Sequence, residues 1–151
     1  MKKLVMLLAM IATTTGFAAE RTVFRDAMGR QIGTAERNGN KIIYRDAMGR
    51  QTGSADIGSN GKITYRDAMG RQTGTAQEQN GRTVFRDAMG RQTGTAQEQN
   101  GRVTYRDGMG RQTGTAQQQQ NGKVTYRDEM GRQTGTAQSN GKQPPLRTQN
   151  H

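Results

Sequence analysis

The residues best suited to chemistry in this chain are arginines that recur in pairs around a single aspartate. Arg66 and Arg71 flank Asp67 in this way within the segment YRDAMGRQTGTAQ, residues 65–77. A regular basic row of this kind could track nucleic acid or an acidic polysaccharide. The alternative interpretation is a solvated face whose charge the aspartates partly balance. The candidate polyanion-contact residues are Arg25, Arg30, Arg45, Arg50, Arg66, Arg71, Arg86, Arg91, Arg106, Arg111, Arg127 and Arg132.

Aromatic residues mark the register of the same repeated block. Successive aromatics are 20, 21, 20, 20 and 21 residues apart, and the block occurs six times. Self-similarity at a fixed period of this size predicts a repeat architecture, in which each unit buries its surface against its neighbours. The candidate stacking aromatics are Phe24, Tyr44, Tyr65, Phe85, Tyr105 and Tyr126.

Side chains suited to catalysis are scarce. The single histidine, His151, lies in the final segment, and the chain has no cysteine. No Ser-His-acid or Cys-His set can be assembled from these residues. The aspartate of each unit is better explained as the cap of a turn. We therefore predict a protein that is not an enzyme and that carries no cofactor.

Metal binding has two candidate ligand sets, and neither is sufficient. Calcium needs six or more oxygen ligands, whereas each unit offers one carboxylate beside two arginines. Periodic methionines could offer soft ligands to Cu(I), but methionine also fills gaps between packed turns. We predict no metal site. The periodic methionines are Met28, Met48, Met69, Met89, Met109 and Met130.

The composition limits how large a core the chain can build. The formal net charge is +11, aromatic residues make up 5% of the chain, and tryptophan is absent. Abundant Gly, Gln, Asn and charge are close to the composition of disordered chains, so a disordered polycation is one alternative. The β-forming residues, however, occupy the same positions in every unit, which favours ordered strands.

Each unit is predicted to fold as strand, turn, strand, turn. In the third unit, residues 62–66 are β-branched and aromatic, and residues 71–76 form a second strand that Gly74 weakens. The segment DAMG at 67–70 suits a type I turn whose glycine adopts positive φ. Asn80 and Gly81 give a second turn, and one-residue insertions just before two of the equivalent Asn-Gly pairs indicate an exposed loop.

Alternation along the first strand separates two faces. Ile63 and Tyr65 point one way, whereas Thr64 and Arg66 point the other. The fold class is therefore all-β, with six units in an elongated β-meander strip or a β-solenoid. In-register stacking would place equivalent arginines about 4.8 Å apart, with repulsion of about 0.9 kcal/mol per pair, which mildly favours the meander. Ladders of Gln and Asn favour the solenoid, so both remain open.

The two ends of the chain differ from the repeats. Lys2 and Lys3 precede an apolar run over residues 4–12, and Ala18 follows at a small-x-small site, which predicts a signal peptide over residues 1–18. The six repeats occupy residues 19–142, and residues 143–151, with both prolines, are predicted to be a disordered tail. The apolar run is too short to span a bilayer as a helix. We expect export to the periplasm or the cell exterior, with no membrane span after cleavage.

The segment at residues 65–71 resembles the YD repeat of RHS-type and teneurin proteins. Asp67, Gly70 and Arg71 match the repeat, which is also about this long. This resemblance covers residues 21–142 and implies β-hairpins joined into long sheet strips. Six units are too few to close a shell around a cargo, so encapsulation is not implied.

The chain is also similar in outline to a curli-type amyloid subunit. Gln72, Gly74 and Ala76 and the Asn-Gly turns echo the curlin pattern, and the repeat length and predicted export agree. This similarity implies a self-assembling fibre subunit. Neither terminus looks like a polar capping repeat, and open sheet ends invite pairing with another chain.

Together these features predict an exported, non-enzymatic repeat protein with a structural or adhesive role at the cell envelope or exterior. Its arginines would contact an acidic polysaccharide, lipopolysaccharide or extracellular DNA. The alternatives are a curli-like functional amyloid subunit that associates with itself and a disordered secreted polycation.

Overall fold

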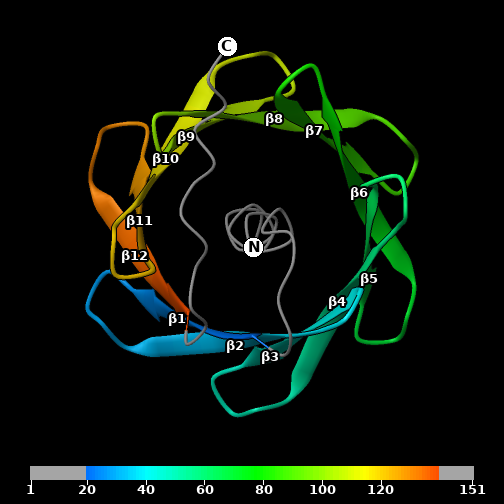
Figure 1. Cartoon of the computed structure of the whole chain (residues 1–151), viewed down its shortest axis with the longest axis horizontal. Helices are drawn as coiled ribbons and strands as arrows, with labels where there is room; N and C mark the ends of the chain where they lie inside the picture. Colours follow the sequence, from blue (N-terminus) through cyan, green and yellow to red (C-terminus); the bar gives the residue numbers. More distant parts are fainter. Residues whose placement is uncertain (1–19, 140–151) are drawn as a thin grey trace.

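The computed structural model describes residues 20–139, which form twelve antiparallel strands arranged in a ring (Figure 1). The signal peptide predicted at 1–18 and the tail predicted at 143–151 lie outside the described residues. The strands are β1 (Glu20–Asp26), β2 (Gln31–Asn38), β3 (Lys41–Asp46), β4 (Gln51–Ile57), β5 (Ile63–Asp67), β6 (Gln72–Gln79), β7 (Arg82–Asp87), β8 (Gln92–Gln99), β9 (Arg102–Asp107), β10 (Gln112–Gln118), β11 (Lys123–Asp128) and β12 (Gln133–Ser139). In residues 20–139 we find no helix long and apolar enough to cross a membrane.

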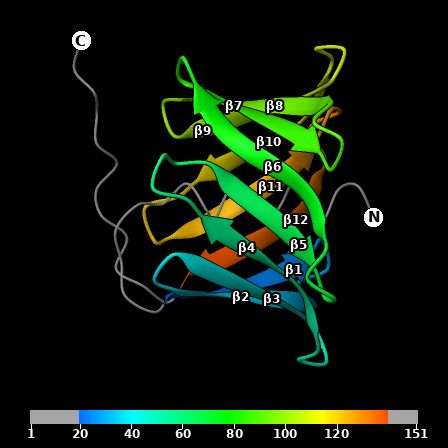
Figure 2. The same ribbon diagram turned by 90° about the vertical axis from the view of Figure 1, so that its right-hand side faces the viewer.

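The sheet is a closed barrel, which confirms the all-β class but not the open strip or the solenoid. Each strand pairs with its neighbours in sequence, as in a meander, and β1 also pairs with β12. The strands run obliquely across the barrel wall (Figure 2), as closure of a twisted sheet requires. Closure pairs the backbone groups that the end strands of a strip would leave open. The open sheet ends that suggested self-association are therefore absent from the described strands.

Near-identical units explain why the ring closes. In the middle of the chain, Tyr65 lies opposite Ala55 on one side and Gly74 on the other. At the seam, Phe24 lies opposite Ala137 in the same way, with Gly33 on its other side. The last unit thus offers the first unit the same edge that every unit offers its successor. Because all six units curve the sheet in the same way, the last strand, β12, comes to lie beside the first, β1.

The DAMG turns have the predicted geometry. The backbone N–H of Gly70 donates to the carbonyl of Asp67 at 3.0 Å, and the N–H of Asp67 donates to the carbonyl of Arg71 at 2.9 Å. Gly70 has φ of 85°, which is a left-handed conformation that glycine adopts without strain. This is a type I turn followed by a glycine bulge, and the other five units repeat it.

The turns at the other end come in two lengths. Asn80 and Gly81 both have positive φ, 54° and 74°, which is the two-residue turn suited to twisted hairpins. In the unit with an insertion before Asn60, the N–H of Gly61 instead donates to the carbonyl of Gly58 at 3.0 Å, so the turn becomes a longer bulged one. These loops are exposed, as the variation in length predicts. The last Asn-Gly pair, at 140–141, lies outside the described residues.

The inner face of the barrel carries the core. Ile63 and Tyr65 are buried on this face, whereas Arg66 is exposed on the outer face, so the predicted alternation is confirmed. Moving from the Asn-Gly end, the first inner layer combines alanines with Ile42 and Ile63, and the next is the ring of six aromatics. All six candidate aromatics therefore lie inside the barrel.

Gly74 permits a close approach of strands that a larger residue would prevent, a role that the sequence expectation of a weakened strand did not include. A Cβ atom at Gly74 would lie 2.5 Å from the carbonyl oxygen of Arg86 on β7, which is closer than real contacts allow. The same distance recurs at the glycines at 33, 53, 114 and 135. Each glycine thus permits a close approach between the second strand of one unit and the first strand of the next.

Candidate binding rim and lumen

One end of the barrel collects the arginines, aspartates and methionines of every unit. Successive turns of a meander alternate between the two ends, so all six DAMG-type turns lie at the same end. We call this end the rim and define it as residues 25–30, 45–50, 66–71, 86–91, 106–111 and 127–132. The hairpin loops project outward around the circumference (Figure 1). The row of arginines predicted from the sequence is therefore a ring.

The aspartate of each turn holds the backbone and one arginine together. In the third unit, Oδ1 of Asp67 accepts the N–H of Met69 at 2.9 Å and that of Arg71 at 3.0 Å. Oδ2 accepts Nε–H of Arg71 at 2.8 Å. Partial desolvation acts to raise the pKa of Asp67, but these hydrogen bonds and the charge of Arg71 outweigh it, so the pKa lies below its usual value. The other five aspartates have the same partners and the same direction of shift.

The rim arginines fall into two classes. The turn arginines each pair with the aspartate of their own turn at 2.8–2.9 Å. The strand-end arginines each donate from a guanidinium N–H to the carbonyl of the turn glycine, at 3.1 Å for Arg66 and Gly70. The turn arginines are Arg30, Arg50, Arg71, Arg91, Arg111 and Arg132, and the strand-end arginines are Arg25, Arg45, Arg66, Arg86, Arg106 and Arg127.

All six turn arginines have their charge balanced locally, whereas five of the six strand-end arginines have no carboxylate partner within residues 20–139. Among the strand-end arginines of residues 20–139, Arg66 alone pairs with a carboxylate, that of Asp56 at 3.1 Å. The bond to the turn glycine orients each guanidinium without neutralising it. The rim therefore presents a ring of fixed positive charges on its outer side.

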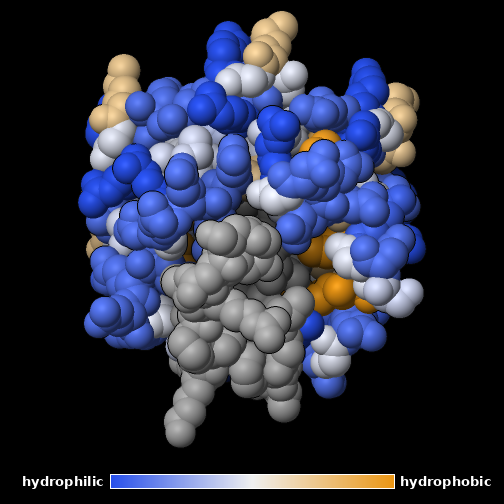
Figure 3. Space-filling view, turned by 45° about the horizontal axis from the view of Figure 1, so that its top comes forward, coloured by the Kyte–Doolittle hydropathy of each residue, from blue (hydrophilic) through white to orange (hydrophobic). Residues whose placement is uncertain are grey.

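The methionine of each turn is strongly exposed at the rim. The six turn methionines are 74–83% exposed, so they do not fill gaps between turns, as one interpretation of the sequence suggested. Figure 3 shows pale orange side chains that protrude separately beside strongly hydrophilic ones. Each turn thus projects one apolar side chain next to a strand-end arginine.

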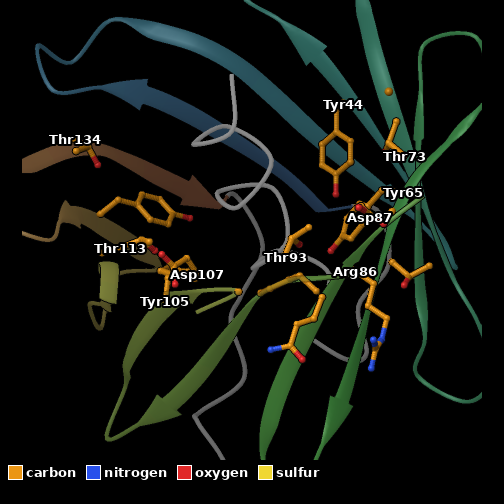
Figure 4. A pocket seen from close by; sticks show the side chains of 18 of the residues that line it. Tyr44, Tyr65, Thr73, Arg86, Asp87, Thr93, Tyr105, Asp107, Thr113 and Thr134 are labelled. Atoms are coloured by element: carbon orange, nitrogen blue, oxygen red, sulfur yellow. The ribbon is translucent and has the colours of Figure 1, made fainter. Parts of the chain in front are cut away.

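A cavity of about 900 Å³ occupies the lumen on the rim side of the aromatic ring (Figure 4). Its lining residues include five of the six aromatics, the bulge threonines of five units, four of the six rim aspartates, and the rim residues Arg66, Arg86, Arg127 and Glu129, but no residue of the alanine and isoleucine layer. The rings form the floor and the threonines form the wall. The bulge threonines that line it are Thr52, Thr73, Thr93, Thr113 and Thr134.

Two tyrosine hydroxyls at the floor lack a partner. The hydroxyls of Tyr65 and Tyr105 are buried and make no hydrogen bond to any residue of the described part. Both residues flank Phe85 in the ring, since they lie on β5 and β9 with β7 between them. Burial raises the pKa of all four tyrosines far above the usual value, and the tyrosine neighbours of Tyr65 and Tyr105 raise their pKa values further.

The described residues offer no ready metal centre. In residues 20–139, no three His, Cys, Asp or Glu side chains gather closely enough to hold a metal ion. The rim aspartates already accept three hydrogen bonds each, as in Asp67. What the rim and lumen can do chemically is bind: the rim offers cations and apolar side chains, and the lumen offers aromatic faces and hydroxyls.

The sequence identified the rim residues but missed the lumen. Tyr65 and Asp67 are two residues apart on one strand, and this spacing indicates that the aromatics and the aspartates point to the same face of the sheet. In an open strip that face would be a flat surface. This face lines a lumen only because the sheet closes into a barrel, so no pattern within one unit could predict a cavity.

Comparisons with known proteins leave the family open. No protein-family model matches the chain, and no curated protein matches it. Among solved structures, alternansucrase in complex with isomaltononaose is 19% identical over 71% of this chain and 12% of that chain, with a TM-score of 0.21. At this TM-score the likeness says nothing about fold or function.

Proposed function

We propose that the protein is an exported, non-enzymatic barrel that attaches by its rim to an anionic, lipid-bearing surface of the cell envelope. The observation that supports this most directly is the ring of strand-end arginines with an exposed methionine beside each one. This is the adhesive role expected from the sequence, with the contact assigned to one end of the barrel.

The arginines supply the long-range attraction. Basic residues next to an anionic bilayer contribute about 1 kcal/mol each, and this falls off within a Debye length of about 8 Å at physiological salt. The ring places six such charges at one end of a rigid sheet, five of them without a carboxylate partner in residues 20–139, so they can meet a flat surface together. Many weak contacts on one rigid body give a strong combined attachment.

The methionines favour lipid over the other anionic partners. An acidic polysaccharide or DNA would satisfy the arginines but would leave six apolar side chains in water. A bilayer or lipopolysaccharide offers phosphate groups above acyl chains, so that arginine and methionine of each turn both gain a partner. Full burial of a methionine side chain is worth about 1.5–3 kcal/mol, and shallow insertion gains part of that.

Vesicle binding tests the proposal. We expect the protein to cosediment with phosphatidylcholine vesicles containing phosphatidylglycerol or lipopolysaccharide, and much less with pure phosphatidylcholine. Changing the six strand-end arginines to glutamine should weaken binding more than a hundredfold, given about 1 kcal/mol per arginine. The six methionine-to-glutamine changes should also weaken it.

The opposite end of the barrel provides a matched control. One basic residue lies at or next to the start of the first strand of each unit there, so an equal number of charges can be removed at equivalent positions. Strands of up to eight residues separate the two ends by more than a Debye length, so this variant should keep its vesicle binding. Equal losses in both variants would refute attachment by the rim. The control residues are Arg21, Lys41, Lys62, Arg82, Arg102 and Lys123.

The partner class is tested separately with heparin and double-stranded DNA. Binding to these polymers that equals vesicle binding, and that does not change when the methionines become glutamine, would make the protein a general polyanion binder. Salt gives a further check, since attachment that is unchanged between low and high salt would exclude the arginine ring as its cause.

Export is the remaining part of the proposal. It rests on Lys2 and Lys3, the apolar run at 4–12 and the small residues before Ala19. N-terminal sequencing of the protein from fractionated cells should find Ala19 as the first residue. A cytoplasmic protein that begins at Met1 would contradict it.

A further inference from the structure

We infer that the lumen is a binding site for a small, uncharged, largely apolar molecule with at least one hydrogen-bonding group. The cavity of about 900 Å³ and the two partnerless tyrosine hydroxyls at its floor lead to this inference. Binding pockets for small molecules typically measure about 300–1,000 Å³ and combine apolar walls with a few placed polar groups.

The floor determines the apolar part of the ligand. Tyr65, Phe85 and Tyr105 come from alternate strands and present neighbouring rings to the same space. Aromatic faces pack well against flat apolar or aromatic groups. No Lys or Arg belongs to this layer, because each arginine that follows an aromatic points to the outer face.

The hydroxyls determine the polar part. Tyr65 is 8% exposed and Tyr105 is 5% exposed, and neither hydroxyl has a hydrogen-bond partner in residues 20–139. Buried polar groups normally have a partner, so two exceptions on either side of Phe85 indicate where a ligand group would bond. A tyrosine hydroxyl both donates and accepts, so a ligand hydroxyl, carbonyl or amine is suitable.

The charge of the ligand follows from the wall. Neutral threonine hydroxyls lie between the floor and the mouth, and the four rim aspartates that reach the cavity already have their arginine partners. Arg66, Arg86, Arg127 and Glu129 also line the cavity, but they belong to the rim and not to the aromatic floor. A charged group at the floor would be buried with no counterion, which is costly. The floor therefore selects a molecule whose buried part is neutral.

Dye binding tests this inference without lipid. N-phenyl-1-naphthylamine is neutral and aromatic, carries one N–H group, and fluoresces strongly only in apolar surroundings. We expect its emission to rise and saturate at one dye per protein. Changing Thr93 and Thr113 to tryptophan should fill the cavity and reduce dye affinity at least tenfold. The chain has no native tryptophan, so quenching of each new indole also reports the bound dye.

A matched pair on the outer face controls for the bulk of tryptophan. Thr64 and Thr104 lie on β5 and β9 next to the floor tyrosines but on the other side of the wall. Tryptophan at these positions should leave dye affinity within about twofold, since it adds no atoms to the lumen. Dye emission that does not saturate, or equal losses in both pairs, would overturn the luminal site.

The hydroxyls are tested with two ligands of one shape. We expect 2-naphthol to displace the dye at roughly tenfold lower concentration than naphthalene, because only the former can bond to Tyr65 or Tyr105. Changing both tyrosines to phenylalanine should bring the two ligands within about twofold. If the tenfold preference persists in that variant, the hydroxyls do not select the ligand.

Discussion

Nε of Arg71 lies 2.8 Å from Oδ2 of Asp67, while Oδ1 of the same carboxylate caps the backbone of the turn between them. One side chain therefore fixes both the turn and the direction of the arginine. Each of the six units repeats this arrangement. The rim is thus a set of prearranged side chains, and its order depends on the ionised state of its aspartates.

Acid should loosen the barrel at its rim. The pKa of each rim aspartate is lowered in the folded protein, whereas an unfolded aspartate titrates near pH 3.9. The stability that these carboxylates contribute is therefore fully present above about pH 4 and is lost as pH falls through the folded pKa. We expect the thermal midpoint, followed by circular dichroism, to drop steeply below pH 4. Replacing the six aspartates with asparagine should lower the midpoint at pH 7 and flatten this drop; an unchanged acid profile in that variant would contradict the assignment.

Alkali should unfold the barrel through its tyrosines. Burial raises the pKa of all four tyrosines of the chain, so the folded state favours the neutral phenol. Their contribution to stability is present below the unfolded pKa of about 10 and is lost as pH rises toward the folded values. Tyrosinate absorbance should therefore appear together with loss of the β-sheet signal in circular dichroism. Absorbance that rises near pH 10 while the sheet signal stays intact would show that the aromatic ring is accessible to water.

Gly74→Ala should destabilise the protein by about 1–3 kcal/mol, the usual range for overpacking. Its new Cβ would lie 2.5 Å from a backbone carbonyl of the next strand, which cannot move without bending β7. Gly108→Ala is the matched control: its Cβ would lie 3.0 Å from the carbonyl oxygen of Gln92, but four other units already carry alanine at this turn position. Urea unfolding of both variants gives the comparison. Equal midpoints for the two would mean that the strands do not approach this closely.

Closure of the barrel can be tested with a disulfide. Val23 of β1 lies directly opposite Gln138 of β12, and the chain has no cysteine of its own. Cysteines at these two positions should form an intramolecular bond on mild oxidation, since directly opposed strand residues have suitable Cβ separations. The control pair uses Val23 and Gln97, which is equivalent to Gln138 within its unit but lies in β8. Dimers or free thiols in the first variant would indicate an open strip.

The sequence predicted much of the local structure for identifiable reasons. The spacing of Asp67 and Gly70 specified a bulged type I turn, because few residues other than glycine adopt positive φ there. Alternation around Tyr65 specified which residues face inward, because successive side chains of a strand point to opposite sides. The arginines were also identified correctly as a regular basic array, although their shape in space was not.

The interpretation of single residues failed where the neighbour across the sheet decides the role. The sequence predicts that Gly74 weakens its strand, whereas the structure shows that the carbonyl of Arg86 leaves no room for a larger residue. Met69 was considered a filler between turns, yet its turn projects away from its neighbours and leaves it exposed. Each error concerns a distance between units, which no pattern within one unit reports.

What the sequence determined by itself is the unit: two strands, a capped turn of fixed length, and an inner and an outer face. These are properties of dihedral preferences and side-chain parity, and they act within about twenty residues. What only the tertiary structure decided is the ring. Whether the bend of one unit, repeated six times, brings β1 beside β12 depends on twist and register summed over the whole sheet. Closure of the barrel places the arginines in a ring at the rim and the aromatics at the floor of a cavity.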